Sequence, residues 1–557
     1  MEESGTTGEG RRLAAGAQCL IAFALSTILY VLAFPPLDSG ETAFVFAAPI
    51  IIYGLFGKPA RWEGLQLFGF GWLAWFILMS WLRHCTSSLE IPFAGIFGIF
   101  LTALLSLVLS LFWSSWCWIT LKCVRWTKHD PVAYRLVLIL GLAALWVVLE
   151  WLRGVIFTGL PWLPLSVSQW NRNFILQVVA LTGGAGLSFV LIVFNFGVAY
   201  PVYTYWTNRR GSWMSRLSFE LYLAMIVLVV SIGSGIYTAK FAQYPRVEGP
   251  KLGFVQPNAG VELKWDMERV NDNLKVLEDL STYASYLGAE LILWPESPTP
   301  LPLKGDYRMQ QWAEDLSARL GIPILAGNIA RENELDDNGN RWYNAVFTVH
   351  PETGLNSEDY YRKRRLVPFG EYIPLTGMIP FIDKFVPIDA NFGKGESAEP
   401  ISFNPDELDA RKIGNLICYE DIFPPLARAN TLEGANWHYV ATNNAWFGEG
   451  AGAWQHAAHS ILRAVETRRP VVRCGNAGWS GWIDEYGNIR HVMMDDSNSI
   501  YFQGVDAVKF SRCSYWSGRM SIYVQHGDWF VALSGALLLV IGFLGYWLKS
   551  PRRLPQA

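Results

Sequence analysis

Long apolar runs constrain this chain more than any other feature of its sequence. Such runs dominate residues 13–240 and 529–547, whereas residues 250–525 have an ordinary globular composition. The chain is 51% hydrophobic and 17% charged, against about 25% charged residues in a typical soluble domain. A single soluble domain is therefore excluded, and the apolar parts predict an α-helical membrane domain.

A helix needs about 20 apolar residues to cross a bilayer. Eight segments reach or approach this length, namely 13–34, 41–57, 64–82, 92–121, 134–156, 174–203, 219–239 and 529–547. The first follows two arginines but lacks a convincing cleavage site, so we interpret it as a span and not as a signal peptide. We expect a membrane domain with seven helices over 1–245, a catalytic domain over 246–525, and a last span with a tail over 526–557.

The distribution of lysine and arginine predicts the orientation of these spans. With a cytoplasmic N-terminus, fourteen Lys and Arg residues fall on the inner side and only Arg83, Arg153 and Arg172 in the short outer loops. Positive residues accumulate on the cytoplasmic side of membrane proteins. The pattern predicts cytoplasmic N- and C-termini, with residues 240–528 on the outer face.

Two residues of opposite charge lie near the outer end of the predicted span over 134–156. Glu150 and Arg153 are three residues apart, which places them on one helix face, where they could pair. One interpretation is helix packing and mutual neutralisation near the membrane edge, and the other is contact with a substrate. The sequence leaves both open.

Composition also excludes several classes of partner. The net charge is −3 and no basic patch with interleaved aromatic residues occurs, so we expect no nucleic acid partner. The seven cysteines have no regular spacing, which argues against a disulfide framework or a metal site. We expect neither a metal nor a cofactor.

Residues 250–525 alternate short β-rich runs with helical patterns, which is typical of a layered α/β domain. Strands are predicted at 251–256, 291–294, 322–326, 345–349, 413–418, 439–442 and 471–474. Helices are predicted at 270–287, 309–320 and 453–467.

Three reactive side chains occur at or near the ends of predicted strands. Glu296 follows a strand stopped by a proline, Lys363 lies in a basic run over 362–365, and Cys418 ends a strand. A thiolate can attack a carbonyl carbon while a carboxylate moves the proton and an ammonium stabilises the oxyanion. Each residue alone has an ordinary explanation, since free cysteines are often simply buried and a basic run can be a solvated loop. Their combination in one α/β domain predicts acyl transfer through a thioester.

The sequence contexts of these residues resemble those of a known superfamily. Trp-Pro-Glu at 294–296, Lys363 followed by Pro-Phe-Gly-Glu at 368–371, and Cys-Tyr-Glu at 418–420 resemble the nitrilase, or carbon–nitrogen hydrolase, superfamily. The apolar spans, with LVPFGEYIP at 366–374 and NNAWFG at 443–448, resemble the apolipoprotein N-acyltransferase family. One departure is Asn444, where that family usually has aspartate.

This resemblance implies a nitrilase-like αββα sandwich attached to a membrane domain of about eight transmembrane helices. It also implies a role for each matching residue: Cys418 as nucleophile, Glu296 as general base, Lys363 as oxyanion-stabilising cation, Glu371 as the glutamate that positions the lysine, Tyr419 and Glu420 as residues flanking the nucleophile at the substrate, and Trp265 as a tryptophan near the lipid entrance.

The reaction implied by the resemblance has two steps. The cysteine takes an acyl chain from a phospholipid, typically phosphatidylethanolamine, and the thioester then acylates the N-terminal amine of the diacylglyceryl-cysteine of an apolipoprotein. The implied location is the bacterial inner membrane, with the catalytic domain on the periplasmic side. We expect a monomer.

The segment after Glu371 is rich in apolar residues, among them Phe381 and Ile382, and is broken by Pro374 and Pro380. The prolines predict a loop. It could cover the domain's own core, or it could be a membrane-dipping lid whose Phe381 and Ile382 contact the acyl chain and exclude water from the thioester. We favour the lid.

Two other functions compete with acyl transfer to an amine. A membrane-tethered amidase would use the same residues with water as acceptor, because a fold alone does not determine function. A transporter with an outer accessory domain would predict polar midplane residues and broken helices in corresponding halves, and neither is visible in the sequence.

Overall fold

The computed structural model of the chain describes residues 8–86, 93–260, 267–336, 339–374, 392–402 and 412–549. The chain divides into two compact units. Unit 1 comprises Met1–Ser80, Ile99–Ile236 and Asp528–Ala557, and unit 2 comprises Trp81–Gly98 and Tyr237–Gly527. Residues 81–98, which fall within the expected membrane domain, thus belong to the second unit. The division expected from the sequence is otherwise close to this one and stays a prediction.

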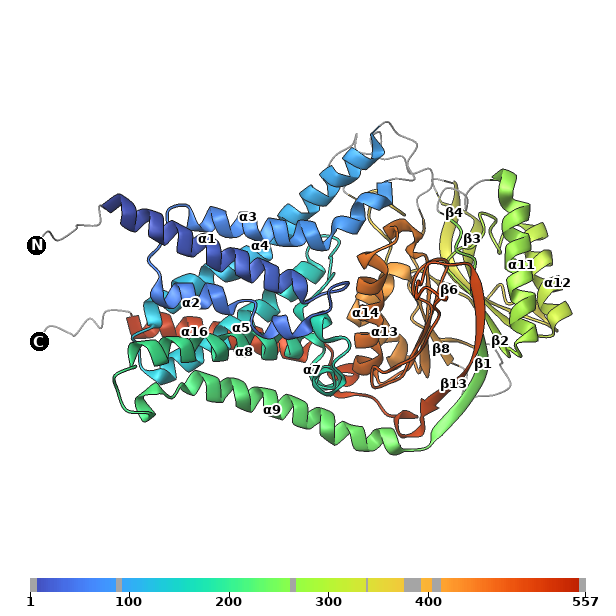
Figure 1. Cartoon of the computed structure of the whole chain (residues 1–557). Coiled ribbons are helices and arrows are strands. Elements are labelled where there is room, and N and C mark those ends of the chain that lie inside the picture. The colour runs from blue at the N-terminus through green and yellow to red at the C-terminus, as the bar shows by residue number, and fades with distance from the viewer. Residues whose placement is uncertain are drawn as a thin grey trace, which may run out of the picture. The chain divides into compact units, whose positions relative to one another are not determined.

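Unit 1 is a bundle of apolar helices (Figure 1). Its main helices are α1 (Gly8–Leu32), α2 (Ala48–Phe56), α3 (Glu63–Leu78), α4 (Ala94–Thr127), α5 (Val132–Val155), α8 (Gly184–Thr207), α9 (Phe219–Ala239) and α16 (Trp529–Lys549). In Figure 1, α5 lies beside α8 and α16, and α1 beside α3. Side chains on the outer faces of these helices are large, apolar and exposed, as a lipid-facing surface requires.

Four helices of the described residues are long and apolar enough to cross a membrane: α4, α5, α8, and α9 with the turn that follows it, Phe219–Gln243. A fifth is obtained if α3 and the adjoining 3₁₀ helix Ser80–Thr86 form one bent span. Shorter apolar helices cover Gly16–Leu32, Gly40–Phe56, Asn173–Thr182 and Trp529–Leu544. The total of eight spans stays a prediction.

The expectation of one continuous helix over 174–203 was wrong. Two short helices, α6 (Asn173–Leu176) and α7 (Val179–Thr182), precede α8. The chain turns between α7 and α8 at Gly183, whose φ is +66°, a conformation that glycine adopts without steric cost. A count of apolar residues does not detect such a turn.

Several polar side chains buried in unit 1 are paired with one another or with the backbone. Glu63 accepts two hydrogen bonds from Arg125, at 2.7 and 2.8 Å. The Asn195 side chain accepts from the Ala47 amide at 2.7 Å and donates to the Ala43 carbonyl at 2.9 Å. Such pairing offsets the cost of placing polar groups in an apolar bundle.

Unit 2 contains two β-sheets. The first has strand order β13-β1-β2-β3-β4-β5, with β6 also paired to β4, and the second has order β12-β11-β10-β9-β8-β7. The first sheet contains β1 (Arg246–Gln256), β2 (Leu291–Trp294), β3 (Ile324–Asp336), β4 (Gly339–His350), β5 (Gly354–Leu355), β6 (Tyr361–Arg362) and β13 (Gly504–Cys513). The second contains β7 (Ile401–Ser402), β8 (Lys412–Ile417), β9 (Trp437–Thr442), β10 (Val471–Gly475), β11 (Gly481–Ile483) and β12 (Ile489–Val492).

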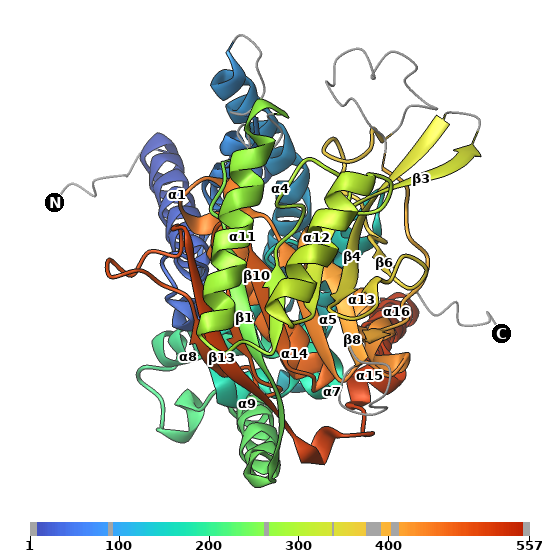
Figure 2. The same cartoon turned by 90° about the vertical axis from the view of Figure 1, so that its right-hand side faces the viewer.

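The central strands of each sheet are parallel, as β1-β2-β3 and β8-β9-β10, and the outer strands are antiparallel. The sheets share an apolar core, to which Leu293 and Val346 contribute from one sheet and Tyr439 and Val472 from the other. Figures 1 and 2 show α11 (Val270–Tyr286) and α12 (Tyr307–Leu320) covering the first sheet, and Figure 1 shows α13 (Pro424–Leu432) and α14 (Ala451–Thr467) covering the second. The predicted αββα sandwich is therefore confirmed.

Each predicted strand and helix of unit 2 is present in the structure, with ends that differ by a few residues or, in β1, β3 and β4, by more. The last predicted position of one strand was wrong: β8 ends at Ile417, and Cys418 begins a 3₁₀ helix, η8 (Cys418–Ile422). The sequence did not predict β5, β6, β7, β11, β12 and β13. Strand β13 is mostly half-buried, without the regular alternation that marks a strand with one solvated face.

Candidate active site

Cys418 lies on a sharp turn between β8 and η8. Its φ is +49°, in the left-handed region, which costs a residue other than glycine about 1–3 kcal/mol. Its side chain is buried, with 9% of the residue exposed. A conformation of this kind persists only where the surroundings hold it, and two sets of contacts do so here.

The first set centres on the Glu420 carboxylate. One of its oxygens accepts from the backbone amides of Arg364 and Arg365, at 2.6 and 2.9 Å. The other accepts from the Ile417 amide at 2.8 Å and from the Tyr361 hydroxyl at 2.7 Å. Glu420 is fully buried, so its contacts favour a bracing role over the predicted contact with substrate. The brace joins the turn that carries Cys418 to the segment that carries Lys363.

The second set centres on the His456 ring, which is fully buried. Its Nε2 faces two acceptors, the Cys418 carbonyl at 3.1 Å and Asp421 Oδ1 at 2.7 Å. Its Nδ1 faces two donors, Asn444 Nδ2 at 2.9 Å and Arg473 Nη2 at 3.4 Å. This network suits a hydrogen on Nε2, as assigned from the partners. Asn444, the departure from the family pattern, thus acts as a donor to the ring.

Lys363 follows β6, and its backbone amide donates to the Asn344 carbonyl of β4 at 2.8 Å. Its Nζ contacts Glu371 Oε1 at 2.8 Å and Glu296 Oε1 at 3.3 Å. The residue is 1% exposed, so the possibility that this lysine belongs to a solvated loop is excluded. The structure brings the predicted base, cation and positioning glutamate together.

Glu296 follows β2 and Pro295, on a turn whose next residue, Ser297, has a φ of +40°. The Ser297 amide donates to the Gly327 carbonyl of β3 at 3.1 Å. A Cβ at Gly327 would lie 2.4 Å from the Pro295 carbonyl oxygen, closer than any stable contact. Only glycine lets β3 pass this close to the turn that presents Glu296.

Asn344 is a site residue that sequence reasoning missed. Its Nδ2 donates to Glu296 Oε1 at 2.7 Å and to Glu371 Oε1 at 2.9 Å. It therefore links the two carboxylates that hold the Lys363 ammonium. The only signal in the sequence was its place directly before the predicted strand at 345–349, and an amide there suggests no chemistry by itself.

Electrostatics divide the roles of these groups. Burial opposes the Lys363 ammonium, but Glu371 and Glu296 outweigh it and hold the pKa of that group above its usual range. Burial raises the pKa of the Cys418 thiol to about 12, with the Glu296 carboxylate adding to the rise and Lys363 opposing it. The resting site thus pairs a protonated thiol with an ionised lysine. The Glu296 carboxylate is the acidic group whose charge acts on this thiol.

The other predicted site residues are placed as follows. Glu371 Oε2 accepts from the Val367 amide at 2.8 Å, which fixes the side chain that holds Lys363. Tyr419 is half-buried beside the nucleophile, its ring edge against Phe423 with centroids 5.0 Å apart. Trp265, Phe381 and Ile382, predicted to contact lipid, lie outside the described residues.

Family comparisons match both parts of the chain. The carbon–nitrogen hydrolase family matches residues 251–504, which contain each residue of the site described above. The apolipoprotein N-acyltransferase N-terminal domain matches residues 26–197, which lie in unit 1 except for residues 81–98.

Solved structures similar to this chain include a nitrilase-superfamily protein of Saccharomyces cerevisiae, at 19% identity over 48% of this chain and 90% of that one, with a TM-score of 0.34. They also include an amidase of Nesterenkonia, at 17% identity over 53% of this chain and 99% of that one, with a TM-score of 0.36.

Relatives named apolipoprotein N-acyltransferase match nearly the whole chain. The protein of Geobacter metallireducens is 27% identical over 94% of this chain and 95% of its own length. A Pseudomonas aeruginosa protein is 28% identical over 98% and 97%, and the Rickettsia prowazekii protein 29% identical over 93% and 96%. Together with the matched families and the site geometry, these relatives show that the chain belongs to the apolipoprotein N-acyltransferase family.

Proposed function

We propose that this membrane enzyme moves an acyl chain from a phospholipid, through a thioester on Cys418, to the N-terminal amine of the diacylglyceryl-cysteine of an apolipoprotein. The observation that carries the mechanism is the buried Lys363 ammonium, held by Glu296 and Glu371 within electrostatic reach of the Cys418 thiol. Membership of the family supports the acceptor.

In the first step, the Glu296 carboxylate takes the thiol proton as the Cys418 sulfur attacks an ester carbonyl carbon of the phospholipid. The Lys363 ammonium stabilises the oxyanion that forms on the carbonyl oxygen. The carbon–oxygen bond to glycerol then breaks. Glu296 returns the proton to the departing alkoxide, which leaves as a lysophospholipid, and the acyl chain stays on sulfur.

In the second step, the amine of the apolipoprotein attacks the thioester carbonyl, and Lys363 stabilises the second oxyanion. Glu296 accepts a proton from the attacking nitrogen. The carbon–sulfur bond breaks, the thiolate regains the proton, and the product is an amide. Glu371 binds the Lys363 ammonium, and Asn344 donates to both Glu296 and Glu371. These contacts keep Lys363 and Glu296 in one arrangement through both steps.

The finer parts of the proposal concern place and partners. We propose phosphatidylethanolamine as the donor, the bacterial inner membrane as the location, cytoplasmic termini, a periplasmic catalytic domain and a monomer. The excess of positive residues on one side of the spans supports the orientation. Tyr419 beside the nucleophile, and Trp265, Phe381 and Ile382, are proposed lipid contacts.

The test is incubation of the purified full chain with a phosphatidylethanolamine radiolabelled in its acyl chain. We expect a protein adduct that hydroxylamine releases, absent in Cys418→Ala and retained in Cys474→Ala. Cys474 is a matched control because it is buried in β10, where its thiol donates to the Val255 and Leu293 carbonyls. An adduct mapped to Cys474, or label released only as free fatty acid when an apolipoprotein is supplied, would contradict the proposal.

A further inference from the structure

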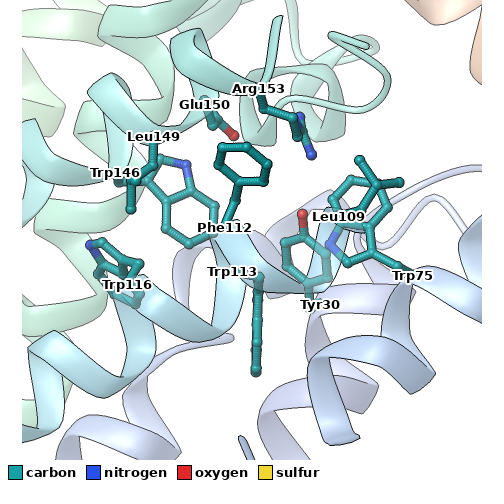
Figure 3. A pocket seen from close by; sticks show the side chains of 10 residues that line it. All are labelled: Tyr30, Trp75, Leu109, Phe112, Trp113, Trp116, Trp146, Leu149, Glu150 and Arg153. Carbon is teal, nitrogen blue, oxygen red and sulfur yellow. The ribbon is translucent and has the colours of Figure 1, made fainter. Parts of the chain in front are cut away.

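A pocket lies within unit 1 (Figure 3). Eight of its ten lining residues are aromatic or apolar, and the other two are Glu150 and Arg153 of α5. The lining residues are Tyr30, Trp75, Leu109, Phe112, Trp113, Trp116, Trp146, Leu149, Glu150 and Arg153. An apolar pocket with a few convergent polar groups is the usual form of a small-molecule site.

Arg153 is 6% exposed, and its Nε and Nη2 have no hydrogen-bond partner among the described residues. The guanidinium lies over the Trp75 ring, 4.7 Å from its centroid. Figure 3 shows the guanidinium pointing into the pocket, toward the Tyr30 hydroxyl. Burying a guanidinium with two unpartnered nitrogens is unfavourable, so these nitrogens point to a partner outside the described residues.

Glu150 is not that partner. The two charges attract each other, but they form no contact ion pair among the described residues, and Glu150 Oε1 accepts from the Leu165 backbone amide at 2.6 Å. Two further donors at the pocket, the indole nitrogens of Trp75 and Trp113, also have no acceptor there. The unpartnered N–H groups of Arg153, Trp75 and Trp113 suit an anionic ligand, although the Glu150 carboxylate also lines the pocket.

The other lining residues indicate the kind of molecule to which the anionic group belongs. Leu109, Phe112 and Trp113 give the pocket an apolar wall on α4, and their neighbour Leu111 is 54% exposed on the outer face of that helix. In the proposed orientation Arg153, two residues from the end of α5, lies at the outer end of its span. Lipid phosphates lie at that depth.

We infer that this pocket binds the phosphate of a glycerophospholipid, with Arg153 as the anion ligand and an acyl chain against the α4 wall. The inference rests on the proposed function in identifying the lipid as an acyl donor. Binding of the lipid does not depend on formation of the thioester. It is therefore measured in the full chain carrying Cys418→Ala, which cannot form the thioester, so a failure of binding and a failure of acyl transfer are distinguishable.

The probe is a phosphatidylethanolamine with a photoactivatable diazirine in its acyl chain, and the adducts are mapped by peptide mass spectrometry. We expect labelling of the α4 segment that contains Leu109, Phe112 and Trp113. Arg153→Gln should reduce that labelling by about 10–100-fold, the usual effect of losing a charge-assisted hydrogen bond. Arg153→Lys should retain most of it, which separates loss of charge from loss of fold. The matched control is Arg172→Gln, since Arg172 of the same unit is already paired with Glu41 at 2.6 Å, and its labelling should not change.

A competition experiment on the chain with Arg153 intact distinguishes a lipid phosphate from free phosphate as the bound anion. Unlabelled compounds compete with the photoactivatable probe. Unlabelled short-chain phosphatidylethanolamine should displace the probe at a concentration about tenfold lower than diacylglycerol with the same chains. Equal competition by diacylglycerol, or unchanged labelling in Arg153→Gln, would overturn the inference. Displacement by inorganic phosphate as readily as by the phospholipid would also overturn it, by assigning the pocket to the free ion.

Discussion

Glu296 acts on Cys418 in two opposite ways. As the proposed base it would remove the thiol proton, but as a negative charge it helps burial to raise the pKa of the thiol to about 12. The two effects can be separated by removing the charge while keeping the shape. In Glu296→Gln the thiol pKa should fall, because a nearby anion no longer opposes the thiolate.

Glu296→Gln should therefore react faster than wild type with iodoacetamide at Cys418 at pH 8.5, while acyl transfer falls by about 10²–10⁴-fold through loss of the base. Lys363→Met should change the thiol pKa in the other direction, upward, and slow both reactions. Alkylation of Cys418 is followed by mass spectrometry. Slower alkylation in Glu296→Gln would contradict the assigned electrostatics.

We expect the hydrogen bonds from Asn344 to its two carboxylate partners to be important for the rate of thioester formation. Asn344→Leu has nearly the same size but cannot donate to Glu296 or Glu371. Losing hydrogen bonds to charged groups costs about 1.5–3 kcal/mol, so we expect a loss of about 10–100-fold in the rate of thioester formation. Asn328→Leu is a suitable control, as Asn328 is buried on the adjacent strand β3 and donates to neither carboxylate. Equal losses in both variants would indicate a general effect on the sheet.

The reactive residues could be predicted from sequence because they combine chemistry with position. Glu296 and Cys418 follow short apolar strands, and Lys363 has a recognisable context. Asn344 and His456 could not be predicted, since their importance lies in the atoms they face: two carboxylates for the first, and the Cys418 carbonyl for the second. Those partners lie far away along the chain and meet only when the strands are paired.

At the scale of the element, the strands that form the core of the sandwich were predictable because they are short, continuous apolar runs. The antiparallel strand β13 and the break before α8 were not. The first lacks regular alternation, and the second depends on a single positive φ at Gly183 within a run that is apolar throughout. In both cases backbone geometry determines the secondary structure, and the pattern of apolar residues does not indicate that geometry.

The close approach of β3 to the turn that follows β2 predicts the effect of a substitution at Gly327. In Gly327→Ala the new Cβ would meet the Pro295 carbonyl oxygen at 2.4 Å, so the turn that presents Glu296 must shift. Overpacking of this kind costs about 1–3 kcal/mol of stability, and a displacement of about 1 Å can lower a rate about 10²-fold. We expect acyl transfer to fall by at least about tenfold while the protein still folds. Gly535→Ala on α16, where a Cβ meets open space, should leave the rate unchanged.

At the scale of the whole molecule, the chain combines an apolar helical unit with a layered α/β unit. This division was predictable because composition changes sharply near residue 240. The placing of residues 81–98 with the second unit was not, since they lie between two apolar runs and nothing local marks them. The orientation of the spans rests on charge alone, and it leads to a direct test.

Tyr244 and Arg210 are both exposed and lie on either side of α9 in the sequence. In intact cells, Tyr244→Cys should be labelled by a membrane-impermeant maleimide and Arg210→Cys only after the membrane is opened. The background should carry serine at Cys85 and Cys123, the two half-buried native thiols. The reverse pattern would show that the chain is inserted with the opposite orientation.

The left-handed conformation of Cys418 has a consequence for how this enzyme can evolve. At most buried positions glycine is less favourable than a residue with a side chain, but at a φ of +49° it would relieve a strain of about 1–2 kcal/mol. Thermodynamic stability and catalysis therefore favour different residues at the same position. Selection for stability alone would remove the proposed nucleophile, so we expect the cysteine to persist only while its chemistry is under selection.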